Sequence, residues 1–377
     1  MIYLYYILPV VTIIGKNGGD IFKFAGDAIL VIWPLKREGE DNSQLCRKAI
    51  QCGLEIQEKS KNNIANLSVK IGIGFGDFKV AFMGGEFKRC EYLVIGEGMK
   101  QACESETHAS GGGEIICSND IFELVKDYYN FKSTQEEGHG GHNVHGFEPE
   151  NKSNIPKEKY WKFISKLDVG KVQTTADAFI MRSKFKNEQI RSSTEILRRF
   201  VPAAITLHLD INQEFWAKEL RMISVMFLLL GVDLRDTEKQ EGMERVQIIV
   251  NTIQRCVYKN MGALNKFLMD DKGSVMLMCW GLPPISSTDD HLRSVLCGFD
   301  LINELKKLNC SAHIGISTGS AFSGVCGTIG NRKEYSLLGE IVNLSARNMQ
   351  KAIEISKKKK PEEKYYMLIC KRTADVK

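Results

Sequence analysis

The sequence repeats itself 243 residues further along the chain. The stretch KIGIGFGDFKVAFMGGEFKRCEYLVIGEGMK, which begins at Lys70, aligns without a gap with HIGISTGSAFSGVCGTIGNRKEYSLLGEIVN, which begins at His313. Identical residues share this one offset: Lys23 and Lys266, Phe24 and Phe267, Ile71 and Ile314, Gly72 and Gly315, Ile73 and Ile316, Glu91 and Glu334, Tyr92 and Tyr335, Gly96 and Gly339, and Glu97 and Glu340. Because chance is a poor account of so many matches at one spacing, we infer two copies of one α/β unit.

Apolar periodicity predicts similar elements in the two copies. For the first copy we expect strands near 21–25, 28–33, 69–76 and 79–83, and a helix at 43–60. For the second we expect strands near 223–230, 264–270, 275–280, 312–318 and 321–326, and helices near 237–260, 289–308 and 340–355. Residues 133–157 are rich in Gly, His, Glu and Asn and predict a loop, and 158–200 predict a polar, basic linker with a helix near 186–200. The predicted domains are therefore 1–132 and 201–377, joined by 133–200.

Composition and charge exclude several classes of protein. The chain has 377 residues, 43% of them hydrophobic and 26% charged, which is enough apolar material for two cores. A net charge of +5 without a basic stripe argues against a nucleic-acid partner. The opening run MIYLYYILPVVTII has about fourteen apolar residues, fewer than the ~20 of a membrane span, so we expect a soluble protein. The 11 cysteines form no CxxC pair and are typical of reduced thiols in a cytosolic protein.

Three motifs carry a resemblance to a known family: GGDIFKFAGDAILVIWP, DDKGSVMLMCWGLP and EYSLLGEIVNLSARN. They are similar to those of the class III nucleotide cyclases, and above all of the soluble, bicarbonate-responsive adenylyl cyclases. The resemblance covers most of the chain except the linker. It implies an α/β (α+β) chain of two tandem ferredoxin-like cyclase domains that pair head to tail as an intramolecular pseudo-twofold heterodimer.

The same resemblance implies an activity and its cofactors. ATP would lose pyrophosphate as its 3′ hydroxyl attacks the α-phosphorus, giving cyclic AMP at one composite site between the halves. Two Mg²⁺ or Mn²⁺ ions would activate the hydroxyl and neutralise the phosphates. Asp27 matches the second metal aspartate of the family, although the AGD tripeptide would also suit an acid in a hairpin turn.

The resemblance assigns catalytic and base-recognition roles to the second copy. Asn343 and Arg347 match a pair that orients the ribose and stabilises the pentavalent phosphorus. Their spacing of four places them on one helix face, which would equally suit a plain surface Asn and Arg. Lys272 and Ser336 match the positions that recognise adenine, where guanine-specific relatives carry Glu and Cys. Lys272 could instead cap an exposed turn.

Two lysines of the first copy receive weaker assignments. Lys70 would contact the terminal phosphates, and Lys23 matches a lysine of the family's regulatory, bicarbonate pocket. Three histidines of the loop, His139, His142 and His145, have metal-binding spacing, but no cysteine or acid completes a tetrahedral site, so we expect a loop.

The first copy departs from the family pattern in three places. The family's first metal aspartate should lie some fifty residues before Asp27, and this sequence has only 26 residues there. Lys100 and Glu104 stand where the second copy has Asn343 and Arg347, and Glu104 would repel a phosphate. The arginine of the bicarbonate pocket, expected near Cys103, is also missing, so we do not expect bicarbonate control.

Two explanations of the missing aspartate lead to different functions. We expect the sequence to be a fragment of an active adenylyl cyclase, which relatives place in the cytoplasm and in cilia. The alternative is a catalytically inactive, cyclase-like module that binds nucleotide or holds a larger assembly together. A third comparison, of NGGDIF with the GGDEF turn of diguanylate cyclases, is disfavoured by the tandem repeat.

Overall fold

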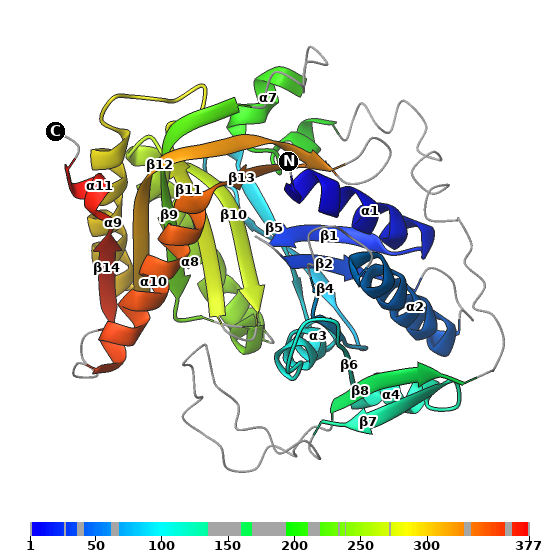
Figure 1. Cartoon of the computed structure of the whole chain (residues 1–377). Helices are drawn as coiled ribbons and strands as arrows, with labels where there is room; N and C mark the ends of the chain where they lie inside the picture. The colour runs from blue at the N-terminus through cyan, green and yellow to red at the C-terminus, as the bar shows by residue number, and fades with distance from the viewer. Residues whose placement is uncertain are drawn as a thin grey trace. The chain divides into compact units, whose positions relative to one another are not determined.

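The protein is described by a computed structural model (Figure 1), which covers residues 2–25, 28–35, 41–61, 68–134, 160–167, 194–209, 219–232, 234–237, 239–270, 273–327, 333–358 and 364–375. The chain divides into two compact units. The first unit comprises Met1–Lys79, Gly96–Lys186 and Gly327–Glu334, and the second comprises Val80–Ile95, Asn187–Cys326 and Tyr335–Lys377. Each unit therefore takes in one short segment from the other half of the sequence.

The second unit contains a ferredoxin-like sheet. Along the chain the elements are β9, α8, β10, β11, α9 and β12, and the antiparallel order in the sheet is β12, β9, β11, β10. This is the β-α-β-β-α-β arrangement, which confirms the predicted fold class for this copy. The bounds are β9 Glu219–Leu230, α8 Gln240–Lys259, β10 Ala263–Asp270, β11 Gly273–Trp280, α9 Asp290–Lys307 and β12 Ala312–Gly327.

Further elements complete the second unit. Strands β13 and β14 both pair with β12, β14 in parallel, and a core cluster joins α7 to β9, β11, β12 and β13. Helix α10 contacts β9 and β14. The bounds are β4 Lys79–Gly84, η1 Glu86–Lys88, β5 Cys90–Ile95, α7 Ala203–Leu209, η3 Leu234–Thr237, β13 Lys333–Leu338, α10 Glu340–Lys358, β14 Tyr365–Ile369 and α11 Lys371–Asp375.

The first unit contains two smaller sheets and four helices in its described part. Strands β1 and β2 form an antiparallel pair, and the other sheet has the order β3, β6, β8, β7. Strand β3 pairs with β6 in parallel, just as β12 pairs with β14. The bounds are α1 Ile2–Lys16, β1 Asp20–Ala25, β2 Ala28–Ile32, α2 Asn42–Lys61, β3 Ile71–Ile73, α3 Glu97–Thr107, β6 Ile115–Ser118, α4 Asn119–Val125, β7 Tyr129–Ser133 and β8 Tyr160–Lys166.

The two copies repeat the same side-chain interactions at the end of their first helix. In each copy the side-chain amide of an asparagine donates to the carbonyl four residues earlier and to a carboxylate of the next helix. A tryptophan indole N–H donates in turn to the backbone carbonyl of that asparagine. The first copy uses Asn17, Ile13, Glu55 and Trp33. The second uses Asn260, Cys256, Asp300 and Trp280. A register shift in the hairpin that follows falls between Ile21 and Lys23 and between Leu264 and Lys266. The tandem repeat is therefore present in three dimensions.

The opening apolar run forms helix α1, which the sequence pattern did not predict. Ile7, Val10, Val11 and Ile14 are buried against a core that includes Phe24 of β1. Helix α1 ends at Lys16, which is 243 residues before Lys259, the last residue of α8. The apolarity of the run is thus explained by core packing.

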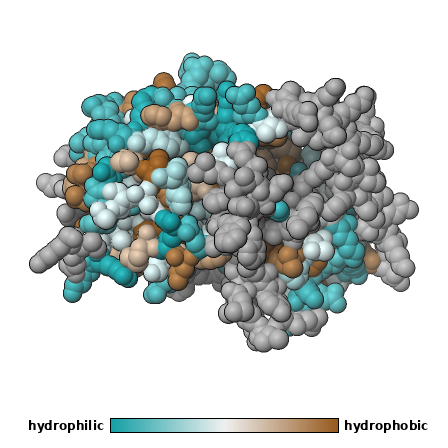
Figure 2. All heavy atoms as spheres, turned by 90° about the horizontal axis from the view of Figure 1, so that it is seen from above, coloured by the Kyte–Doolittle hydropathy of each residue, from teal (hydrophilic) through white to brown (hydrophobic). Residues whose placement is uncertain are grey.

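Among the described residues, no helix combines the length and apolarity that crossing a membrane requires. On the face seen in Figure 2, hydrophilic side chains alternate with small clusters of apolar ones among the described residues.

Three other predictions about secondary structure differ from the structure. Strand β12 is one continuous strand, where we expected two, because Gly319 and Ser320 stay extended and pair with β9. Strand β8 lies in the stretch predicted as linker, and its Tyr160 is buried. Of the helix expected near 186–200, residues 194–198 are helical, and 186–193 lie outside the described residues. The domain boundaries stay predictions.

A loop at the tip of the β4–β5 hairpin is held by two glutamines of α8 in the second unit. The amide of Gln254 donates to the carbonyl of Arg89 over 2.8 Å and accepts from the N–H of Gly85 over 3.1 Å. Gln247 exchanges two hydrogen bonds of 3.0 and 2.8 Å with the backbone of Gly84. The Gly85 N–H also donates to the Arg89 carbonyl within the hairpin over 2.8 Å, so the glutamine side chains of the second copy add to the backbone bonding of the hairpin tip.

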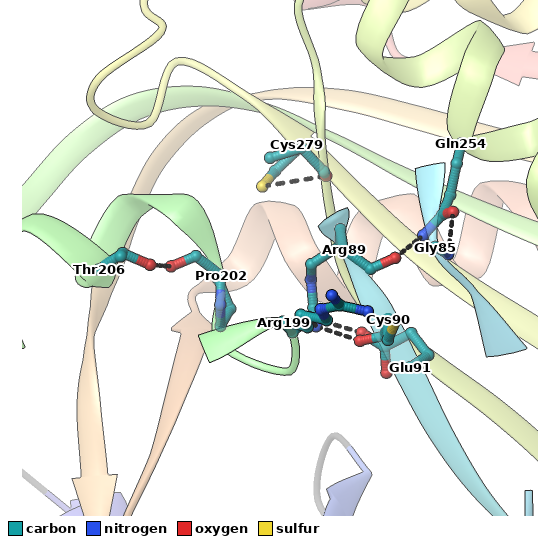
Figure 3. Close-up of polar contacts among 10 residues, drawn as sticks. Gly85, Arg89, Cys90, Glu91, Arg199, Pro202, Thr206, Gln254 and Cys279 are labelled. Carbon is teal, nitrogen blue, oxygen red and sulfur yellow. Dashed lines mark hydrogen bonds and ion pairs between the residues drawn. The ribbon is translucent and has the colours of Figure 1, made fainter. Parts of the chain in front are cut away.

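A buried ion pair lies within the same hairpin, and hydrogen bonds beside it join the hairpin to the segment before α7 (Figure 3). The guanidinium of Arg89 contacts the carboxylate of Glu91, with 8% and 3% of these side chains exposed. Arg89 also donates to the carbonyl of Arg199 over 3.1 Å, and the Cys90 N–H donates to that carbonyl over 2.8 Å. The carboxylate of Glu91 neutralises the buried charge of Arg89. The two bonds to the Arg199 carbonyl tie residues 89–91 to the rest of the second unit.

Stability should fall at mildly acidic pH because of His313 on β12. Its side chain is buried, and burial, with nearby Lys357, lowers its pKa from 6.5 to about 4. The unfolded chain therefore takes up a proton first as the pH falls, so stability is complete above pH ~6.5 and is lost between ~6.5 and ~4, by up to about 1.4 kcal/mol per pH unit. Urea unfolding at several pH values should show this slope for the native chain and a smaller one for His313→Phe. Equal slopes would contradict the prediction.

Candidate active site

Helix α10 presents the predicted pair Asn343 and Arg347. The helix begins after Gly339, which has a φ of 155° in the turn that connects β13 to α10. Gly96 has a φ of 130° in the corresponding turn of the first copy. The side chains of Asn343 and Arg347 are both exposed. An amide and a guanidinium one helical turn apart can bind a ribose hydroxyl and a phosphate oxygen together.

Ser336 lies on β13, three residues before Gly339. Its side chain is buried, with 3% exposed, and its hydroxyl accepts a hydrogen bond of 3.3 Å from the Lys266 ammonium. Lys266 lies on β10, directly after the register shift of that hairpin, and is itself 7% exposed. A buried ammonium beside a buried hydroxyl forms a donor pair of the kind that could recognise a base edge.

Lys266 is a candidate residue that the motif comparison did not single out. The signal was present in the sequence, because Lys23-Phe24 aligns with Lys266-Phe267 and Lys23 had been assigned to a pocket. The motif DDKG directed attention to Lys272, which lies outside the described residues. Lys266 is therefore a second candidate for the role that the resemblance implies for Lys272.

The residues of the first copy that were assigned to the site are Lys23, Lys70 and Asp27. Lys23 on β1 is buried, and the N–H of the neighbouring Phe24 donates to a Glu334 carboxylate oxygen over 3.1 Å. Lys70 is exposed, and its ammonium donates to the carbonyl of Ala109 over 2.9 Å. Asp27 lies outside the described residues. The roles of these residues therefore stay predictions.

The first copy carries a carboxylate at the position of Arg347. Glu104 on α3 accepts a hydrogen bond of 2.6 Å from the phenol of Tyr160 on β8, and His108 stacks on the same ring. Lys100, the counterpart of Asn343, lies 3.8 Å from the carboxylate of Glu97. The helix face that could stabilise phosphate in the second copy is thus acidic in the first.

Within the described residues, no group of three or more His, Cys, Asp or Glu side chains is arranged to hold a metal ion. The histidines His139, His142 and His145 fall outside those residues. Burial raises the pKa of the Cys46 and Cys279 thiols to about 12, so these cysteines stay protonated near neutral pH.

Comparison with curated proteins finds relatives that align with most of the chain. Adenylate cyclase type 10 from human is 26% identical over 363 residues, and the mouse protein of the same name is 27% identical over 369 residues. Each alignment covers 92% of this chain. The chain is thus similar to adenylate cyclase type 10 over most of its length.

The chain spans about one fifth, 21%, of the length of these adenylate cyclase type 10 relatives. A search against protein-family models found no match. Among solved structures, a bacterial light-regulated adenylyl cyclase aligns with 59% of this chain and 69% of its own, at 15% identity and a TM-score of 0.40. Adenylyl cyclase CyaB from P. aeruginosa aligns with 42% and 81%, at 19% identity and a TM-score of 0.34.

Proposed function

We propose that the chain is the catalytic core of an adenylyl cyclase that converts ATP to 3′,5′-cyclic AMP and pyrophosphate. The observation that supports this most is one strand–turn–helix segment in the second unit. It carries Ser336, hydrogen-bonded to Lys266, and then the exposed pair Asn343 and Arg347. A base contact, a ribose contact and a phosphate contact are thus supplied by adjoining elements.

Each of these side chains has a defined part in the reaction. Asn343 holds the ribose so that its 3′ oxygen is in line with the α-phosphorus. A bond forms between these two atoms as the bond from the α-phosphorus to pyrophosphate breaks, and the hydroxyl proton leaves to water. Arg347 stabilises the negative charge that gathers on the phosphoryl oxygens, because its guanidinium is always charged and is shaped for such oxygens.

The proposal includes divalent metal ions, for which Asp27 would be a ligand. Mg²⁺ prefers a few protein carboxylates together with phosphate oxygens, and a carboxylate following β1 provides such a donor. When bound, Mg²⁺ or Mn²⁺ would lower the pKa of the 3′ hydroxyl and neutralise phosphate charge. Pairing of the two halves around one groove, with Lys70 near the terminal phosphates, is part of the same proposal.

The choice of base tests the proposal. Lys266→Glu combined with Ser336→Cys in the complete gene product should reduce the preference for ATP over GTP by roughly 10² or more, because a site built for one base leaves polar groups unpaired with the other. The measurement is kcat/KM for the two nucleotides.

The matched variant Lys272→Glu with Ser336→Cys separates the two lysines. If Lys266 recognises the base, this second variant should change the preference much less. The opposite ranking would return the role to Lys272, and equal use of ATP and GTP by the native protein would contradict adenine recognition altogether.

The second candidate is an inactive, cyclase-like module. The mirror-image position on α3 already lacks the phosphate-stabilising arginine, because Glu104, bonded to Tyr160, replaces it. In this alternative the site on α10 is inactive as well. Such a module would bind ATP without forming cyclic AMP, or would serve a larger assembly.

A further inference from the structure

Helix α10 is anchored from within by Ser345, which lies between Asn343 and Arg347 in the sequence. The Ser345 side chain has no exposed surface. Its hydroxyl lies 2.7 Å from the carbonyl oxygen of Gly315 on β12 and 2.9 Å from that of Val225 on β9. The donor thus faces two strands, while its neighbours two residues away on either side face solvent.

The repeat shows which part of this anchoring is peculiar to the second copy. A Cβ added to Gly315 would lie 2.2 Å from the Ser345 carbonyl, and one added to Gly72 would lie 2.2 Å from the Ala102 carbonyl. Helix and strand therefore cross equally closely in both copies. Ala102, 243 residues before Ser345, has no hydroxyl to donate.

A second helix-to-strand bond is common to both copies. Asn348 donates to the carbonyl of Ile316 over 3.2 Å, and its counterpart Ser105 donates to the carbonyl of Ile73 over 3.3 Å. This bond is therefore present where the helix crosses the strand in both copies, the one with Glu104 and the one with Arg347. The Ser345 hydroxyl is the added anchor of the helix that carries Asn343 and Arg347.

We propose that Ser345 is a positioning residue for catalysis, which holds α10 on β9 and β12 so that Arg347 meets the transition state. The inference rests on the proposed function. A helix that is tied at one point can still tilt or slide by a fraction of an ångström, and errors of this size at a transition-state contact are costly. The fold itself tolerates alanine here, as Ala102 demonstrates in the first copy.

The test compares Ser345→Ala, Arg347→Ala and the double variant in the complete gene product, with kcat and KM for ATP measured for each. Ser345→Ala should lower kcat at least about tenfold with little change in KM. Because Ser345 acts through Arg347, the double variant should be no slower than Arg347→Ala alone. Ser105→Ala, which removes the shared bond from the first copy, is the matched control and should keep kcat.

The outcomes separate this inference from the proposed function. Native activity that survives Ser345→Ala unchanged, or losses that multiply in the double variant, would overturn the positioning role alone. A thermal unfolding midpoint that falls equally in Ser345→Ala and Ser105→Ala, with equal losses of kcat, would also overturn it, because both would then be structural. Absence of cyclase activity from the native protein would overturn the proposed function, and the positioning role with it.

Discussion

Replacing Arg347 with alanine should lower kcat by about 10² to 10³ and leave KM for ATP nearly unchanged. The charge that Arg347 is proposed to stabilise exists mainly in the transition state, and losing one preorganised donor to such charge costs about this factor. Steady-state kinetics on the complete gene product provide the measurement.

Lys351→Ala is the matched control for this prediction. Lys351 lies one turn further along α10 and pairs at the surface with Glu354 over 2.8 Å. Its loss should change neither constant appreciably, since exposed pairs contribute little. If Arg347→Ala had the same kcat as Lys351→Ala, Arg347 would have no part in catalysis and the inactive module would become the better interpretation.

Replacing Glu91 with alanine should lower the free energy of unfolding by about 3 to 5 kcal/mol. The change leaves the Arg89 guanidinium buried without its carboxylate, and an uncompensated buried charge has a cost of this size. Chemical denaturation of the two chains gives the difference. The double variant Arg89→Met, Glu91→Leu should recover much of the loss, because no charge then remains buried.

Glu123→Ala provides the comparison at the surface. Glu123 pairs with Lys126 over 2.6 Å, with about half of each side chain exposed. Its loss should cost less than about 1 kcal/mol. A Glu91→Ala chain no less stable than Glu123→Ala would mean that the hairpin is not held by the buried pair.

The repeat carried most of the fold that could be predicted. Once Lys23-Phe24 is aligned with Lys266-Phe267, the hairpins β1–β2 and β10–β11 follow, and both place their register shift at the same residues of the repeat. Helix α1 was not predicted because its apolar run was weighed only as a possible membrane span. The sequence predicted two strands in place of β12 because Gly319 and Ser320 resemble a turn, whereas both residues pair with β9 in the sheet.

The sequence motifs singled out fewer residues of the candidate site than the structure brings together. Motifs located Asn343, Arg347 and Ser336, whose environments differ: the first two are exposed and Ser336 is buried. They did not single out Lys266, because its contact with Ser336 joins residues 70 apart and follows from sheet pairing. Nor could a motif reveal what Ser345 contacts, because its two acceptors are backbone carbonyls, which any residue provides.

The central claim is that ATP reacts at this site, and product formation tests it most directly. ATP labelled at the α-phosphate should be incubated with the complete gene product and Mg²⁺ or Mn²⁺, with cyclic AMP and pyrophosphate measured over time. The account predicts the two products in equal amounts, at a rate that falls by about 10² to 10³ in Arg347→Ala. Bound ATP that is recovered intact from the native protein, with no cyclic AMP, would contradict it.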